Sequence, residues 1–283
     1  MPWPIRSGLH RRVGKHIDLD DFPPFDVQPP IGPALRFHHG DTTDYLWWLG
    51  EYERATLELF CHLAAGCEVI LDVGARDGVF TLFGAAANPE AQVVAFEADP
   101  EAVLALQANV ALNQSLAAGR VTVIDAALGT LDGTASLYLS GGNSSLDPQF
   151  RAGASLIEVT VRRGDSVLDE LALGKGVGLM KIDTEATEPD VLTGLDETIR
   201  RDRSLIVCEV LAGRTEDRLQ DFVERHGYGV WRITGQGLAR LPRVIADPSY
   251  RDPNVLLAPA DWSIPPDIHG RAGGQRASGD TLP

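Results

Sequence analysis

Carboxylate side chains stand at the ends of five short apolar runs in this sequence: Asp72, Glu97, Asp125, Asp183 and Glu209. Continuous apolar runs of this length are typical of strands that are buried on both faces of a parallel sheet. The carboxyl ends of parallel strands meet at one edge of the sheet, and ligands bind there. Because crowded carboxylates are costly unless cations or hydrogen bonds meet them, this edge suits a ligand that supplies both.

The first of these acids is followed by a glycine-containing turn. Gly74 and Gly78 separate Asp72 from the apolar start of a helix at Val79. Glycine has no Cβ, so the backbone N–H groups of such a turn can approach a ligand closely. The spacing differs from the G-x-G-x-x-G of nicotinamide-binding turns, which makes a dehydrogenase the least favoured interpretation. Asp72 suits instead a ligand with a cationic end, such as the ammonium of S-adenosylmethionine.

The next two strand ends extend this site to a whole nucleoside. Glu97 lies 97 − 72 = 25 positions after Asp72, close to where a doubly wound fold places the acid that binds ribose hydroxyls. Asp125 is predicted beside the adenine, where it would accept a hydrogen bond from the exocyclic amine. Ala126 would offer its backbone N–H to the ring.

The acids need a scaffold in which strands and helices alternate. Strands are predicted at 69–71, 92–97, 121–125, 177–183, 204–210, 229–234 and 254–258, with helices following most of them. This alternation predicts an α/β fold with a mostly parallel sheet. Between the third and fourth strands, alternating segments at 134–139 and 157–161 predict an inserted antiparallel pair beside the ligand edge, a natural place for substrate contacts.

Length and composition limit the organisation and the partners. The 283 residues suit one large α/β domain, predicted over 45–262, between a proline-rich irregular arm at 1–44 and a disordered tail at 263–283. The net charge of −15 makes nucleic acid an unsuitable partner. The lack of a bilayer-length apolar run, of a signal peptide and of zinc-type cysteine spacing predicts a cytoplasmic protein without a membrane partner. The oligomeric state stays open, a homodimer included.

The start of the chain holds a second group of titratable side chains. His38 and His39 stand near Asp41 and Asp44, but adjacent side chains seldom converge on one ion, so a solvated turn is favoured over a metal site. One helix is predicted over 44–65, directly after this group. No metal site is assigned.

Several segments together carry a family resemblance. They are Asp72-Val73-Gly74-Ala75, Phe96-Glu97-Ala98-Asp99-Pro100, the pair Asn109 and Asn113, and Lys181-Ile182-Asp183-Thr184-Glu185 with Glu188, Val191, Leu192 and Gly194. Over roughly residues 50–260 the chain resembles the FkbM family of S-adenosylmethionine-dependent methyltransferases. The resemblance implies a Rossmann-like class I methyltransferase fold, with a seven-stranded, mostly parallel sheet, helices on both faces and a reversed last strand. It also implies S-adenosylmethionine as the methyl donor and O-methylation of sugar or polyketide hydroxyls in natural product biosynthesis.

The donor-binding residues expected from the motifs and the resemblance are Asp72, Gly74, Ala75, Arg76, Gly78, Glu97, Ala98, Asp125, Ala126 and Asp183. Two segments depart from the family pattern, at three positions. Arg76-Asp77 stands where the family commonly has Asn-Ile, and Ala186 stands where it usually has Gly. Neither change removes a group that the donor chemistry needs, but both leave room for a divergent substrate.

The catalytic candidates are Asp183, Glu185 and Glu209. Methyl transfer is an in-line displacement, so the protein mainly aligns the reactants, and a carboxylate can take the proton of an acceptor hydroxyl. We expect Asp183 next to the transferred methyl, with Glu185 as the better-placed base or hydroxyl anchor and Glu209 as the third candidate. The same acids could bind a divalent cation. N-methylation of a small amine and a donor-binding scaffold without turnover are the alternatives.

Overall fold

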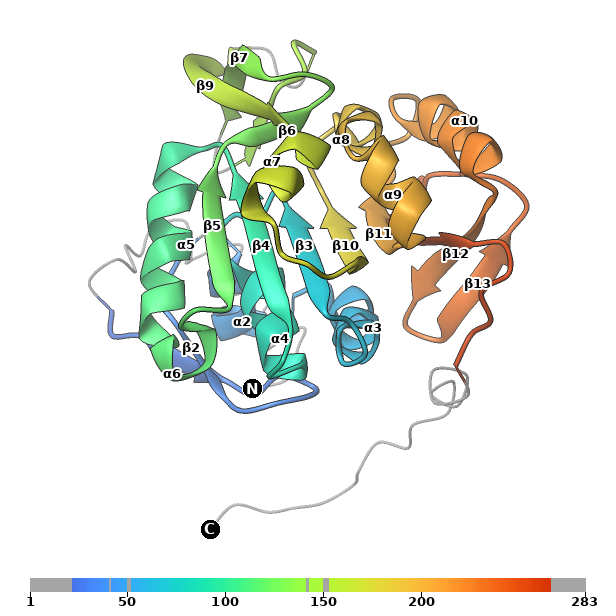
Figure 1. The fold of residues 1–283 in the computed structure, drawn as a ribbon. Coiled ribbons are helices and arrows are strands. Elements are labelled where there is room, and N and C mark those ends of the chain that lie inside the picture. The colour runs from blue at the N-terminus through green and yellow to red at the C-terminus, as the bar shows by residue number, and fades with distance from the viewer. Residues whose placement is uncertain (1–21, 41, 50–51, 141–142, 150–152, 266–283) are drawn as a thin grey trace.

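The computed structural model describes residues 22–40, 42–49, 52–140, 143–149 and 153–265. Its centre is an eight-stranded sheet in the order β13-β12-β14-β11-β10-β3-β4-β5 (Figure 1). These strands are β3 (Val69–Val73), β4 (Gln92–Glu97), β5 (Val121–Asp125), β10 (Val177–Ile182), β11 (Leu205–Glu209), β12 (Tyr228–Thr234), β13 (Gly237–Leu241) and β14 (Asn254–Pro259).

Strand directions in this sheet agree with the expected Rossmann-like fold. β5, β4, β3, β10 and β11 are parallel neighbours, while β14 is antiparallel to both β11 and β12. The reversed last strand is thereby confirmed. The sequence analysis missed the eighth strand, β13, which pairs antiparallel with β12 across the turn that precedes Gly237. This short edge strand carries Arg240, a charged residue of the kind that protects sheet edges.

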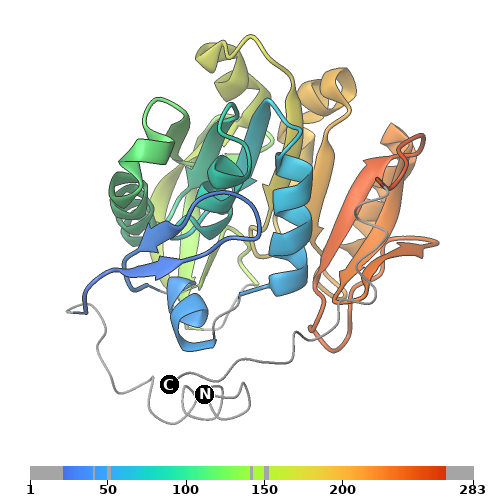
Figure 2. The ribbon, with the colours of Figure 1, turned by 90° about the horizontal axis from the view of Figure 1, so that it is seen from below.

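Helices cover both faces of the sheet (Figure 1 and Figure 2). One face packs α3 (Arg54–Ala64), α4 (Val79–Ala87) and α5 (Pro100–Leu112), which α6 (Gln114–Ala117) extends. The other face packs α7 (Gly164–Leu171), α8 (Glu188–Gly194), α9 (Asp196–Asp202) and α10 (Glu216–His226). The parallel strands are therefore apolar on both sides, and their ends are left to carry the polar residues. In the described part of the chain, no helix combines the length and apolar character of a bilayer span.

The inserted antiparallel pair is present within a second, four-stranded sheet. Its order is β6-β9-β7-β8, formed by β6 (Ala127–Gly129), β7 (Gly133–Ser140), β8 (Asn143–Ser145) and β9 (Ser155–Arg163). Asn143 Nδ2 donates to a carboxylate oxygen of Glu185 at 3.1 Å, and Ser145 Oγ donates to the Glu185 backbone carbonyl at 2.6 Å. The insertion thus covers the carboxyl edge of the main sheet, beyond β10.

The start of the chain differs from the expected irregular arm. β1 (Phe25–Val27) and β2 (Leu35–Phe37) form an antiparallel hairpin, and the side chains of Leu35 and Phe37 are buried in the same core as α3 and α4. The proline content concealed these short strands. The expected single helix is also two helices, α2 (Thr43–Leu49) and α3, because Glu53 breaks it with φ +38°. Residues 1–21 of the arm, Asp41, and the tail from residue 266 onward lie outside the described residues.

Two asparagines of α5 hold the hairpin against the domain. Asn113 accepts from the backbone N–H of Arg36 at 2.9 Å and donates to its carbonyl at 2.7 Å. Asn109 accepts from the backbone N–H of His38 at 2.8 Å and donates to the carbonyl of Asp77 at 2.8 Å. These two side chains form hydrogen bonds with backbone N–H and C=O groups along β2, as a neighbouring strand would. The family pattern marked both asparagines, and the structure gives them this role.

Asp77 continues the same attachment to the beginning of α2. Its buried carboxylate accepts from the backbone N–H groups of Thr42 at 2.8 Å and Thr43 at 2.9 Å, and from the Thr42 hydroxyl. The first N–H groups of a helix have no partner within the helix, so a carboxylate at this place acts as a cap supplied from elsewhere in the chain. Asp77 therefore joins the turn after β3 to the beginning of α2.

We predict that Asp77→Ala lowers the free energy of unfolding by about 2–4 kcal/mol, because a buried charged acceptor of several hydrogen bonds is lost. Urea denaturation would measure the change. The control is Asp217→Ala, whose side chain is 95% exposed and whose removal should cost no more than about 0.5 kcal/mol. Equal effects of the two variants would contradict the capping role.

Candidate active site

A cavity of about 410 Å³ lies at the carboxyl ends of β3, β4, β10 and β11. Three parts of the chain form its walls: the strand ends, the insertion at 137–146, and the segment before the sheet, with Thr42, Tyr45, Tyr52 and Glu53. This volume is within the range of small-molecule sites. The cavity occupies the sheet edge at which the sequence predicted a ligand.

Most of the predicted site residues line this one cavity: Asp72, Gly74, Ala75, Arg76, Glu97, Ala98, Ala126, Asp183, Glu185 and Glu209. Gly78 and Asp125 do not line it. Gly78 begins α4 with φ +90° and faces Leu106 of α5, so its role is in packing. Asp125 is exposed at the end of the edge strand β5, and the idea that three strand tips grip one ligand is therefore not supported at the third tip.

Gly74 allows two strand ends to lie unusually close together. Its φ is +83°, and a Cβ at this position would lie 1.9 Å from the carbonyl oxygen of Asp183. The backbone N–H of Asp183 donates to the carbonyl of Val73 at 3.0 Å, while the N–H groups of Gly74 and Ala75 both donate to the carbonyl of Phe96 at 3.0 Å. The ends of β3, β4 and β10 are thereby fixed relative to one another.

Glu97 is held rigidly by backbone donors. Its Oε2 accepts from the N–H of Arg76 at 2.8 Å, and its Oε1 accepts from the N–H groups of Ala98 and Asp99, each at 2.8 Å. Burial raises the pKa of the Glu97 carboxyl, although these hydrogen bonds oppose the shift. Each carboxylate oxygen has two acceptor positions. Three of the four are filled, so Oε2 keeps one position for a ligand hydroxyl.

Asp72 is a buried carboxyl at the end of β3. Thr81 Oγ1 donates to it at 2.5 Å, and burial raises the pKa of Asp72 to about 6. A cationic ligand beside this carboxyl would favour its ionised form. The Asp72 site therefore suits the ammonium that the sequence analysis assigned to it.

Lys181 supplies a buried positive charge beneath the cavity. Its Nζ lies 2.7 Å from Asp183 Oδ2, 3.3 Å from Asn254 Oδ1 and 4.9 Å from the centre of the Phe80 ring. Burial opposes the charge on Lys181, but the negative charges of Asp183 and Glu53 outweigh it and raise the pKa of the ammonium. The sequence marked Lys181 only as the first residue of the segment 181–185, which carries the family resemblance. In the structure Lys181 is the counter-ion of Asp183.

Several cavity residues were not predicted from the sequence. Glu53 accepts from Asn254 Nδ2 at 2.8 Å, and the Tyr250 hydroxyl donates to Glu209 Oε1. Burial raises the pKa of both Glu53 and its neighbour Tyr52. The break between α2 and α3, where residues 52 and 53 lie, is invisible to hydrophobic periodicity. Tyr250 belongs to an irregular loop with no pattern at all.

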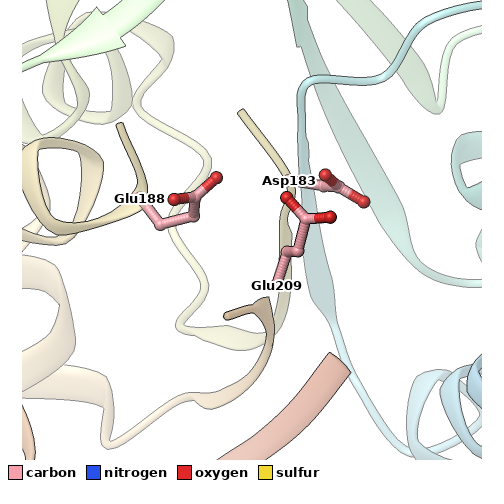
Figure 3. Close-up of side chains that lie close together, drawn as sticks. All are labelled: Asp183, Glu188 and Glu209. Carbon is pink, nitrogen blue, oxygen red and sulfur yellow. The ribbon is translucent and has the colours of Figure 1, made fainter. Parts of the chain in front are cut away.

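Three carboxylates gather where β10 and β11 end. One oxygen from each of Asp183, Glu188 and Glu209 lies within 4.8 Å of the others (Figure 3). Burial raises the pKa of Glu188 to about 7, and burial together with the charge of Asp183 raises that of Glu209 far above its usual value.

The turn that links Asp183 to Glu188 has an uncommon backbone conformation. Glu185 and Ala186 have φ of +57° and +92°, the left-handed region that favours glycine. Glu188 Oε1 accepts from the N–H groups of Thr184 at 2.9 Å and Ala186 at 3.1 Å, which holds the turn in place. The glycine usual in the family at position 186 would fit this conformation without strain.

The strand order, the reversed β14 and the acid-lined cavity define a Rossmann-like class I methyltransferase fold. Residues 72–230, more than half of the chain, match the family model for the methyltransferase FkbM domain. The chain therefore belongs to the FkbM methyltransferase family.

Known proteins agree with this assignment. The chain is 31% identical over 199 residues to 31-O-demethyl-FK506 methyltransferase FkbM of Streptomyces tacrolimicus, covering 58% of this chain and 76% of that protein. It is 31% identical over 158 residues to methyltransferase sdnD of Sordaria araneosa, covering 45% of this chain and 60% of that protein. AMB antimetabolite synthetase AmbE of Pseudomonas aeruginosa is 32% identical over 205 residues, which is 57% of this chain but a tenth (10%) of that protein.

A solved structure of a methyltransferase FkbM from Methylobacillus flagellatus gives a TM-score of 0.48 at 17% identity, covering 68% of this chain and 43% of that chain.

The buried carboxyl of Asp72 makes stability depend on pH. Its pKa rises from the usual 3.8 to about 6 on folding, so the native state holds this proton over a range in which the unfolded state has lost it. The contribution of Asp72 to stability therefore falls as pH rises from about 4 to 6, by at most roughly 3 kcal/mol at about 1.4 kcal/mol per pKa unit.

We predict that Asp72→Asn, which carries no such proton, gains stability relative to the wild type between pH 4.5 and pH 7. Urea denaturation at both pH values would measure the gain. Asp217→Asn, an exposed aspartate, should show no such trend, and parallel pH profiles of Asp72→Asn and the wild type would refute the raised pKa.

Proposed function

We propose that this protein is an S-adenosylmethionine-dependent O-methyltransferase that acts on a hydroxyl group of a small molecule, of the sugar or polyketide type. The observation that carries the proposal is one cavity in which the glycine turn after β3, the fixed carboxylate of Glu97 and the acids after β10 face one another. Family membership supports methyl transfer. The name of the Streptomyces tacrolimicus relative describes a methyltransferase for an O-demethyl natural product.

The cavity residues fit the donor. A Cβ at position 74 would collide with the carbonyl oxygen of Asp183 at 1.9 Å, so glycine at this position lets the turn after β3 lie against the end of β10. In this proposal Asp72 and the turn at Gly74 hold the amino acid part, and Glu97 accepts a hydrogen bond from the ribose. Ala126 lines the cavity, but its N–H donates to the carbonyl of Ile124 at 3.0 Å, so the expected hydrogen bond from this N–H to the adenine ring is not supported. S-adenosylmethionine, when bound, supplies a methyl group activated by a positively charged sulfur.

The residues of the chain then align the acceptor and remove its proton. Glu185 lines the cavity, and its carboxylate is positioned by the amide of Asn143. Asp183 is engaged by Lys181, which suits an orienting role beside the methyl group. Burial and the charge of Asp183 raise the pKa of the Glu209 carboxyl well above its usual value, and its Oε1 is already engaged by the Tyr250 hydroxyl. These contacts favour Glu185 as the base or the hydroxyl anchor.

A small amine is the second candidate acceptor. The acids that line the cavity would attract a cationic ammonium group, which then has to lose a proton before it can be methylated.

We also propose a reducing, cytosolic environment, because all three cysteines, Cys61, Cys67 and Cys208, are free and buried.

Donor binding tests the first part of the proposal. Calorimetry should detect binding of S-adenosylmethionine to the wild type, and Glu97→Ala should weaken it at least tenfold, because the acceptor of the ribose hydroxyls is lost. Glu101→Ala, on the exposed first turn of α5, is the control and should bind normally. A folded wild type without affinity for S-adenosylmethionine would overturn the proposal, whereas donor binding without turnover would leave the scaffold alternative.

Turnover tests the second part. With an acceptor found in a panel of hydroxylated and amine-containing small molecules, Glu185→Gln should lower kcat by about 10²–10⁴-fold, the usual contribution of a general base. Donor affinity should change by less than about twofold. Glu158→Gln, an exposed position on β9, should keep full activity. Full turnover by both Asp183→Asn and Glu185→Gln with donor bound would disprove the assignment.

A further inference from the structure

Negative charge exceeds positive charge at the cavity. The described residues that line it include six carboxylates, Glu53, Asp72, Glu97, Asp183, Glu185 and Glu209, but two cationic side chains, Lys181 and Arg76. Buried Glu188 stands directly behind this lining. Buried carboxylates are costly unless a cation or hydrogen bonds meet them. A further cation would balance this group.

The three acids that are closest together come from different elements. Asp183 follows β10, Glu188 is the first residue of α8, and Glu209 is the last residue of β11. One oxygen of each lies within 4.8 Å of the others, and Figure 3 shows the three side chains gathered between these elements. Backbone contacts fix this arrangement, since β10 pairs directly with β11 and places Ile182 opposite Cys208.

Two of these carboxylates each have an oxygen without a partner. Glu188 and Glu209 are 0% and 3% exposed, and Oε2 of each has no hydrogen-bond partner among the described residues. Their other oxygens are engaged, Glu188 Oε1 by backbone N–H groups and Glu209 Oε1 by the Tyr250 hydroxyl. Buried polar atoms are rarely left unsatisfied, so each such oxygen calls for a ligand.

We propose that Asp183, Glu188 and Glu209 bind one divalent metal ion of the oxygen-preferring kind, Mg²⁺ or Mn²⁺. The set contains oxygen ligands alone, with neither His nor Cys, which selects hard cations. In an octahedral site with metal–oxygen distances of about 2.1 Å, ligand oxygens lie about 3.0–4.2 Å apart. Side-chain shifts of under about 1 Å would bring these three carboxylates to that spacing.

The charge of Lys181 is compatible with this site. Its Nζ is bound to Asp183 Oδ2, which leaves Oδ1 for the metal. Glu188 and Glu209 supply two more negative charges, so three carboxylates face one ammonium and one divalent ion. A divalent ion would offset the two negative charges of Glu188 and Glu209, which Lys181 does not meet.

The metal ion would act on the acceptor. Asp183 and Glu209 line the cavity and Glu188 does not, so the open coordination positions would face the bound acceptor. An acceptor hydroxyl on the ion would lose its proton more easily. The proton would pass to Glu185, the oxygen would use its electron pair to bond the methyl carbon, and the carbon–sulfur electrons would stay on the departing sulfur. This role rests on the proposed function, whereas metal binding itself does not.

Metal binding can be tested on the full chain after treatment with EDTA and dialysis. Titration with MnCl₂, followed by electron paramagnetic resonance at physiological salt, should show one bound Mn²⁺ per chain that excess Mg²⁺ displaces. Glu188→Gln and Glu209→Gln should each weaken Mn²⁺ binding at least tenfold. The control is Asp190→Asn, on the same helix as Glu188 but paired with Arg218 at 2.6 Å, and its affinity should stay within about twofold of the wild type.

The result that would overturn the proposal is a folded wild type that takes up no Mn²⁺, or takes it up with an affinity that neither glutamine variant changes. If an amide at the buried position 209 prevents folding, Glu209→Asp replaces Glu209→Gln in the test. This variant keeps the charge and should bind Mn²⁺ with reduced affinity. Calorimetry with S-adenosylmethionine separates the two proposals. Metal uptake without donor binding would uphold the metal site and reject methyl transfer. Donor binding without metal uptake would reject the metal site and leave the proposed function standing.

Discussion

The ion pair between buried Lys181 and half-buried Asp183 is the interaction on which the cavity depends. A fully buried ammonium is stable only where negative charge and hydrogen-bond acceptors surround it, and here Asp183, Glu53 and Asn254 do so. These partners come from the fourth parallel strand of the sheet, the helical start of the chain and the reversed strand β14. One lysine therefore draws together parts of the chain that are far apart in sequence. The other carboxylates that line the cavity are the groups that can bind a ligand or take up a proton.

The sequence predicted the centre of the fold well because its signals there are local. Apolar runs that end in an acid mark both a buried strand and the edge at which a ligand binds, so Asp72, Glu97, Asp183 and Glu209 could be placed in one cavity. Asp125 shares this pattern but lies at the end of the edge strand β5, where its side chain is exposed. The local pattern does not say whether a strand is central or at the edge of the sheet, and this explains the difference.

The walls of the cavity could not be predicted from the sequence, because the contacts that form them are not local. Tyr52 and Glu53 reach the cavity because Glu53 breaks the helical stretch with a positive φ, and Tyr250 reaches it from a loop. The hairpin at 25–37 forms because Asn109, Asn113 and Asp77 provide partners for its backbone and for α2. These contacts join residues separated by 34 to 77 positions, and no short-range sequence pattern predicts them. Asn109 and Asn113 stood out only as part of a family resemblance.

The attachment of the chain's beginning through Asp77 has a consequence for how such enzymes diversify. Thr42, Tyr45, Tyr52 and Glu53 form a wall of the cavity, yet they precede the segment at 72–230 that defines the family. One wall of the cavity is thus encoded ahead of the segment that defines the family, whereas Glu185 and the insertion around Asn143 lie within it. Substitutions in the leading stretch would reshape this wall while the residues at 72–230 stay unchanged.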